Sequence, residues 1–221
     1  MTNLSTSAST SFRGRRFVGR LVAAVLLLIV LVAGVWLERE ALLQGAADLW
    51  TVSDPVTPSD VVVVLPDDDR RLTRLFVAAE LYKKGLVTKV LVSRVSAKRH
   101  ERLLAIPGGS EFDRVMLQRL AVPDADIETF GQGNVNMKEQ AVALRDWANG
   151  HDISSMVIAT ELFASRRTRR TFNRAFSGSS VRVKVLAFEP GYTRADWWKT
   201  DEGMIAFDKE VMKYLYYRFK Y

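Results

Sequence analysis

The chain has 221 residues, a formal net charge of +7 at pH 7 and no cysteine. This length allows one domain of ordinary size in addition to a membrane anchor, and the missing cysteines exclude disulfides, thiolate metal sites and cysteine nucleophiles. The two histidines, His100 and His151, lie far apart without ligand spacing, so we expect no histidine-rich metal site. Part of the basic charge precedes an apolar segment and part lies in one later helix, so the charge does not indicate nucleic-acid binding.

The N-terminal segment has the features of a membrane anchor. Residues 1–16 are rich in serine, threonine and arginine, and we predict a disordered cytoplasmic tail. Residues 17–37 are apolar apart from Arg20, end near Trp36, and are long enough for a transmembrane helix. Since the basic cluster precedes this span, we expect a single-pass protein with its N-terminus in the cytoplasm and its domain outside. The alternatives are a cleaved signal peptide, for which the cleavage site is poor, and a buried core helix.

After a stalk or linker at 38–58, strand and helix patterns alternate along the chain. The predicted strands are 61–65, 89–93, 127–130, 156–160 and 181–188, and the predicted helices are 72–84, 111–120, 136–148, 165–176 and 203–221. Continuous apolar runs such as 61–65 are typical of parallel strands that are buried on both faces. We therefore expect a three-layer α/β domain over 59–221, in which a Rossmann-like, mainly parallel sheet has helices on both faces.

Ligands of such sheets bind at the carboxyl ends of the strands, so the loops there are of interest. Three aspartates, Asp67 to Asp69, follow the first strand and could hold a divalent cation or a cationic group. The alternative is a solvated loop in which one aspartate caps the next helix. The loop has no glycine-rich turn, which argues against a dinucleotide fingerprint or a P-loop.

Two more strand-to-helix corners carry polar residues. The spacing of Asn136 and Glu139 is that of a capping box, which explains both residues, although both side chains could also face the crevice. Arg166 and Arg167 lie in the first turn of the helix after the fourth strand. Arginines at a helix N-terminus, where the dipole disfavours cations, could serve to bind an anion.

Several short motifs follow one another in a specific order along the chain. They are Asp60–Leu65, Arg74 with Ala78–Gly85, Lys89–Ser93, Glu111 ahead of Leu120–Pro123, Asn136-x-x-Glu139, Thr160 followed by Arg166 and Arg167, and Glu210–Tyr217. In this order they resemble the YdcF, SanA and ElyC family, a domain of unknown function tied to bacterial cell-envelope biogenesis. The resemblance implies a polar pocket built from Arg74, Glu111, Asn136, Glu139, Thr160 and Arg166.

The chain also departs from the pattern of this family. Pro66, Asp67 and Asp68 stand where the family usually has glycines, and Ala164 stands where it usually has a histidine. An acid–base mechanism that rests on that histidine is therefore not available here. Either the chemistry has been lost or the aspartates have replaced it.

Three functions remain open at this point. The first is a factor in peptidoglycan or polysaccharide biogenesis at the bacterial cytoplasmic membrane, which binds an anionic polyprenyl- or sugar-phosphate precursor. The second is a metal-assisted hydrolase or transferase acting on an envelope phosphate or glycan, and the third is a non-catalytic scaffold for envelope-assembly proteins. The expected ligand-binding residues are Asp67, Asp68, Arg74, Glu111, Asn136, Glu139, Thr160, Arg166 and Arg167. No catalytic residue, cofactor or resident metal is assigned, and nucleic acid is not an expected partner.

Two structural features would distinguish these functions. Convergence of Arg74, Glu139 and Arg166 would favour a binding site, and their divergence would favour the scaffold. The aromatic and basic side chains of the C-terminal region could lie at the lipid interface or pack the last helix on the sheet. These side chains are Trp197, Trp198, Lys213, Tyr214, Tyr217, Arg218, Lys220 and Tyr221.

Overall fold

The computed structural model describes residues 10–66, 72–94, 109–133 and 136–220. The chain divides into two compact units, residues 1–46 and 47–221. The first unit contains α1 (Thr10–Leu37) and the first part of α2 (Arg39–Trp50). The second unit holds all the strands and the remaining helices that the structure describes.

The first unit is dominated by one apolar helix. Within α1, residues 19–37 have a mean hydropathy of 2.7 and none of this segment is buried in the structure. Its length and composition suffice to cross a membrane, and a signal sequence has the same properties. α1 begins at Thr10, so residues 10–16, predicted as part of a disordered tail, are helical. This segment contains no proline to stop the helix, and arginine is a good helix former; residues 1–9 lie outside the described part.

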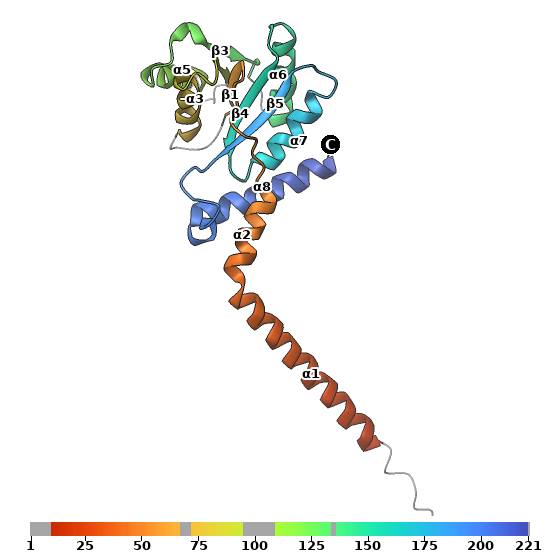
Figure 1. The fold of residues 1–221 in the computed structure, drawn as a ribbon. Helices are drawn as coiled ribbons and strands as arrows, with labels where there is room; N and C mark the ends of the chain where they lie inside the picture. The colour runs from red at the N-terminus through yellow and green to blue at the C-terminus, as the bar shows by residue number, and fades with distance from the viewer. Residues whose placement is uncertain (1–9, 67–71, 95–108, 134–135, 221) are drawn as a thin grey trace, which may run out of the picture. The chain divides into compact units, whose positions relative to one another are not determined.

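The second unit is built on a five-stranded parallel sheet (Figure 1). Its strands are β1 (Val61–Val64), β2 (Lys89–Ser93), β3 (Ile127–Phe130), β4 (Ser155–Glu161) and β5 (Arg182–Phe188). The strand order is β3-β2-β1-β4-β5, and all four pairings are parallel. This order matches the first five positions of the doubly wound arrangement. The α/β class and the parallel sheet expected from the sequence are confirmed.

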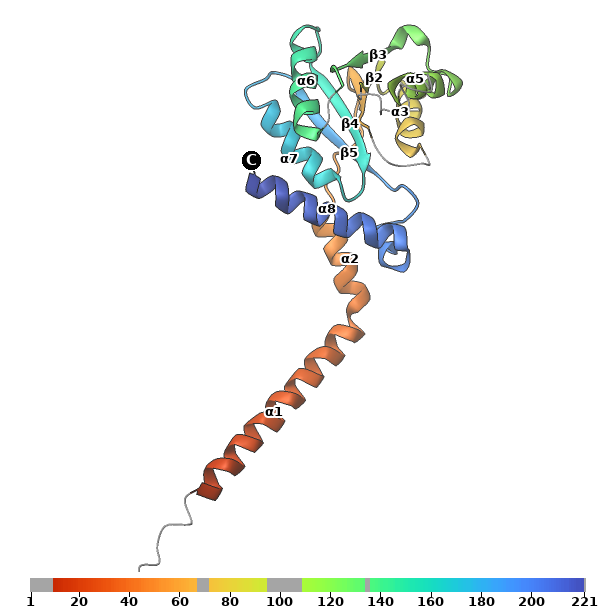
Figure 2. The ribbon, with the colours of Figure 1, turned by 180° about the vertical axis from the view of Figure 1, so that it is seen from behind.

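Helices cover both faces of this sheet (Figures 1 and 2). α3 (Thr73–Lys83) and α5 (Gly109–Arg119) lie on one face, and α6 (Met137–Asn149) and α7 (Ser165–Ala175) lie on the other. The four valines of β1 divide between them: Val62 and Val64 belong to the core under α3 and α5, and Val61 and Val63 to the core under α6 and α7. A run of buried apolar residues thus serves two cores, because successive side chains of a strand point to opposite faces.

The remaining helical elements are two 3₁₀ turns, η1 (Asp124–Asp126) and η2 (Trp197–Lys199), and the C-terminal helix α8 (Asp201–Lys220). The chain between β5 and α8 contains η2. Gly85 follows the last turn of α3 with a φ of 66°, the left-handed conformation in which glycine commonly ends a helix. The predicted elements therefore occur where the sequence places them, with small differences at their ends.

The compact unit begins before residue 59, the predicted start of the domain. Trp50, at the end of α2, donates a hydrogen bond from its indole to the carbonyl of Phe163 at 3.0 Å. Its ring also packs edge-on against Tyr214 of α8, with centroids 5.2 Å apart. Asp54 then pairs with both backbone groups of Val185 in β5 at 2.8 Å. Residues 47–58 are thus part of the domain, because aromatic packing and edge-strand hydrogen bonds attach them to it.

Candidate functional site

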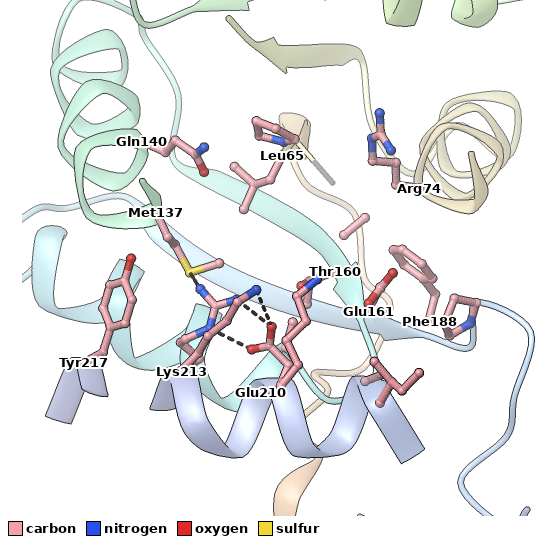
Figure 3. A pocket seen from close by; sticks show the side chains of 18 of the residues that line it. Leu65, Arg74, Met137, Gln140, Thr160, Glu161, Phe188, Glu210, Lys213 and Tyr217 are labelled. Carbon is pink, nitrogen blue, oxygen red and sulfur yellow. Dashed lines mark hydrogen bonds and ion pairs between the residues drawn. The ribbon is translucent and has the colours of Figure 1, made fainter. Parts of the chain in front are cut away.

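A large cavity of the domain lies at the carboxyl ends of the central strands. From β1, the strands β2 and β3 follow toward one edge of the sheet, whereas β4 and β5 lie toward the other edge. The strand order therefore reverses between β1 and β4. Ligands of open α/β sheets bind at such a switch point. The cavity has a volume of about 800 Å³ and is lined from β1, β4, β5, α3 and α8 and from the first turns of α6 and α7 (Figure 3). Its polar lining residues are Arg74, Asn136, Gln140, Thr160, Glu161, Arg167, Tyr192, Glu202, Lys209, Glu210, Lys213 and Tyr217.

Arg74 lies on the α3 side of this cavity, opposite Glu210 and Lys213 (Figure 3). Its side chain is 8% exposed, and Nη2 donates to both carboxylate oxygens of Asp113 in α5, at 3.0 and 3.2 Å. Nε and Nη1 are buried and have no hydrogen-bond partner among the described residues. Burial raises the pKa of the Asp113 carboxyl, and the neighbouring Arg74 opposes that rise only in part. The guanidinium therefore keeps three N–H groups, one on Nε and two on Nη1, for another acceptor.

Arg167 and Glu210 form a second buried ion pair, which joins α7 to α8. Nε and Nη2 of Arg167 donate to the two oxygens of Glu210 at 2.7 and 3.0 Å, and Nη1 contacts the sulfur of Met137 at 3.0 Å. Lys213 also approaches Glu210, at 3.2 Å. Burial alone would raise the pKa of Glu210, but the two cations outweigh it and hold the pKa below its usual value. All three guanidinium nitrogens of Arg167 are engaged, so this residue holds the cavity wall together.

The N-terminus of α7 opens on the same cavity. Its N-cap residue is Ala164, which lines the cavity and supplies no side-chain cap. Thr160, at the end of β4, is buried and its hydroxyl lies 3.3 Å from that of Thr168. The first N–H groups of a helix carry partial positive charge and need acceptors. An uncapped helix end beside a cavity is thus electrostatically suited to an anion.

The capping interpretation of Asn136 and Glu139 agrees with the structure. Asn136 is the N-cap of α6, and its Oδ1 accepts a hydrogen bond from the backbone N–H of Glu139 at 3.0 Å. Its Nδ2 donates to the Glu139 carboxylate at 2.6 Å. Asn136 also lines the main cavity, whereas Glu139 lies on a separate, more open depression with Arg94 and Trp147. Only the amide of this motif reaches the main cavity.

Arg166 has a different environment from Arg167. Its Nε donates to the backbone carbonyl of Trp50 at 3.3 Å, and Nη2 donates to the carbonyl of Leu49. These carbonyls belong to the last turn of α2, which has no further helical partner for them. Arg166 therefore caps α2 and is not among the cavity-lining residues, so Arg74, Glu139 and Arg166 do not converge.

The remaining residues predicted for the site are Glu111, Asp67 and Asp68, and none of them is found at the cavity among the described residues. Glu111 is exposed in the first turn of α5 and does not line the cavity, while Asp113, two residues later, carries the ion pair with Arg74. Asp67 and Asp68 lie outside the described residues. Within the described ranges, no three histidine, aspartate or glutamate side chains form a group that could hold a metal ion.

Sequence reasoning did not select four charged residues that the structure brings to the site. Asp113 pairs with Arg74, and Lys209, Glu210 and Lys213 line the cavity from α8. A signal was present for Glu210, since a carboxylate at a core-facing position of an amphipathic helix needs a cationic partner. Its partner could not be read from the sequence, because Arg167 is distant along the chain.

No protein-family model matches the chain, and no curated protein matches it significantly. The resemblance to the YdcF, SanA and ElyC family therefore stays a prediction.

Proposed function

We propose that this chain is a single-pass protein of the bacterial cytoplasmic membrane, with its N-terminus inside and its α/β domain outside the cytoplasm. In this proposal α1 is the anchor, and the domain binds an anionic envelope precursor in the cavity at the ends of β1 and β4. The precursor class is a polyprenyl phosphate or a sugar phosphate. The length and hydropathy of α1 support the first part, and the lining of the cavity supports the second.

The observation that carries the binding proposal is Arg74. Arg74 lines the cavity, and two of its nitrogens are buried without a described hydrogen-bond partner, a state that costs about 1–3 kcal/mol for each unsatisfied group. A phosphate oxygen accepts strong, often paired hydrogen bonds from a guanidinium. The uncapped N-terminus of α7 at Ala164 adds a second feature of the same cavity that favours negative charge.

A second candidate, the non-catalytic scaffold, is favoured by the divergence of Arg74, Glu139 and Arg166. Glu139 belongs to the cap of α6, and Arg166 to the cap of α2. Under this alternative the cavity has no ligand, and the Arg74–Asp113 pair only joins α3 to α5. The two candidates therefore differ in what the loss of this pair does to phosphate binding.

The test is a double substitution, Arg74→Met with Asp113→Leu, in the full chain in detergent micelles. Replacing both members of a buried pair by apolar residues is often neutral for stability, whereas removing one member leaves a buried charge. Binding of inorganic pyrophosphate and of farnesyl phosphate is measured by isothermal titration calorimetry. We expect binding by the original chain and at least a tenfold loss in the double variant, with little change in Tm.

Arg119→Met, which removes an exposed arginine of α5 away from the cavity, is the matched control and should bind as the original chain does. Equal binding by the double variant would refute the role of Arg74. No binding by the original chain would favour the scaffold.

A further inference from the structure

The C-terminal helix α8 has two faces of different character. Its inner face contains the buried residues Gly203 and Glu210, and Lys213 and Tyr217 line the cavity. Its outer face carries a row of large apolar side chains, which we call the outer stripe. The stripe consists of Met212, Leu215, Tyr216 and Phe219, with exposed fractions of 68, 42, 52 and 84%. Spacings of three, four and seven residues put these side chains on one side of the helix.

The outer stripe is distinct from the aromatic residues that sequence reasoning considered for a lipid interface. Trp197 is only 5% exposed and stacks on Phe207, with ring centroids 4.4 Å apart. Tyr214 packs edge-on against Trp50, and Tyr217 lies near the Arg167 guanidinium. Trp197, Tyr214 and Tyr217 thus pack against the domain, and Tyr221 lies outside the described residues. The described residues of α8 that remain for an external partner include those of the outer stripe.

Basic side chains accompany the stripe along the exposed side of α8. Arg218 and Lys220 are exposed there, and the exposed acidic residues of α8, Asp201, Glu202 and Asp208, all precede the stripe. From Met212 onward, the charged residues of the helix are Lys213, Arg218 and Lys220, which are all basic. Apolar side chains flanked by lysine and arginine are typical of helices that lie in the headgroup region of anionic membranes.

The covalent structure favours a membrane over other partners for this surface. The apolar part of α1 ends at Leu37, and the domain unit begins at Ala47. Even fully extended, the chain spans only about 3.3–3.6 Å per residue, so a membrane containing α1 would stay within a few tens of ångströms of the domain. Tethering raises the effective concentration of the lipid surface, and weak interfacial affinity then suffices for contact.

We propose that the outer stripe of α8 docks into the interface of an anionic membrane, with its apolar side chains among the lipids and its basic side chains at the headgroups. This rests on the proposed function in one respect, namely that α1 spans the membrane. The inner face of the same helix lines the cavity, so docking brings the cavity wall to the level of the headgroups. A phosphate carried by a membrane lipid is then within reach of the site.

The absence of cysteine allows a direct test. Met212→Cys and Phe219→Cys place single thiols in the stripe for labelling with the environment-sensitive probe NBD. Val115→Cys is the matched control, because Val115 is an apolar residue of α5 with 46% exposure. Each labelled full chain is reconstituted into phosphatidylglycerol–phosphatidylcholine liposomes, with and without nitroxide-labelled lipid.

We expect blue-shifted emission at 212 and 219 and quenching by the nitroxide lipid several-fold stronger than at 115. Quenching should weaken in liposomes of phosphatidylcholine alone. Equal, weak quenching at all three positions overturns the proposal. A blue shift that depends on protein density and occurs without quenching by the nitroxide lipid also overturns it, because it would indicate that a second copy of the chain covers the stripe.

Flotation of the same liposomes after alkaline extraction reports on α1 independently. Protein that floats but shows no quenching at 212 and 219 refutes docking while the anchor stands. Protein that is extracted refutes the anchor, and with it the basis of the docking proposal.

Discussion

Replacing Arg167 by methionine removes one half of a buried ion pair and leaves the other half in place. The side chains of Arg167 and Glu210 are 9 and 8% exposed and are joined by two hydrogen bonds. Among the described residues, the Glu210 carboxylate then keeps one ion-pair partner, Lys213, whose side chain is 41% exposed. The remaining charge is thus largely desolvated without adequate compensation.

The expected loss can be estimated from similar buried pairs. Breaking one by removing a single partner costs about 3–5 kcal/mol. For a domain of this size each kcal/mol lowers the Tm by about 2–4 °C, so Arg167→Met should lower it by about 6–20 °C. The double variant Arg167→Met with Glu210→Leu removes both charges and should recover most of that loss.

Near-ultraviolet circular dichroism of the full chain in detergent micelles measures this effect. Every tryptophan except Trp36 lies in the domain unit, so the signal reports mainly on the domain and not on α1. If Arg167→Met costs less than about 1 kcal/mol, the usual worth of an exposed ion pair, the buried pair is not formed in solution.

The pH dependence gives a second refutation. The paired cations lower the pKa of Glu210 despite its burial, so its ionised form contributes stability above the unfolded-state pKa. That contribution is lost as the pH falls through the lower, folded-state pKa. Glu210→Gln should therefore be less stable than the original chain at neutral pH, and the difference should shrink in acid. A constant difference would contradict the pairing.

Two further substitutions test the frame around the site by thermal unfolding. Asp60→Ala removes a carboxylate that accepts hydrogen bonds from both backbone N–H groups of Ser154–Ser155 at 2.7 and 2.8 Å, and should cost about 1.5–3 kcal/mol. These bonds lower the pKa of Asp60, so the cost should shrink as the pH falls through it, and a pH-independent cost would contradict this. Gly203→Ala places a Cβ against the backbone of Trp197, 2.9 Å from its Cα, and should cost about 1–3 kcal/mol or more. A Cβ at Gly109 meets no described atom within 4 Å, so Gly109→Ala should change little; equal effects of the two glycine variants would refute the close contact.

The order of strands and helices could be predicted because local sequence patterns encode it. The apolar run at 61–65 predicts a strand that is buried on both faces. In the structure, its alternate residues belong to the two cores on opposite faces of the sheet. Gly85 and Pro123 mark the ends of helices through backbone geometry that no tertiary contact needs to supply. The start of the domain was harder to predict, because Trp50 belongs to it only through contacts with Phe163 and Tyr214.

The candidate site was only partly predictable for a related reason. The crevice follows from parallel topology, and Arg74, Asn136, Thr160 and Arg167 do line it. Local sequence could not say which of two adjacent arginines faces it. Arg167 turns toward α8, whereas Arg166 turns toward the end of α2, because successive residues of a helix point about 100° apart.

The sequence by itself determined the apolar N-terminal helix, the α/β class and the edge of the sheet where a ligand would bind. All three depend on hydrophobic periodicity and on turn residues that act within a few positions of one another. The tertiary structure alone decided which charges meet there, as with Arg74 and Asp113 or Arg167 and Glu210. It also decided which face of α8 lies inward and which carries the outer stripe. These are long-range pairings, and they depend on how helices pack over the sheet, which no local pattern encodes.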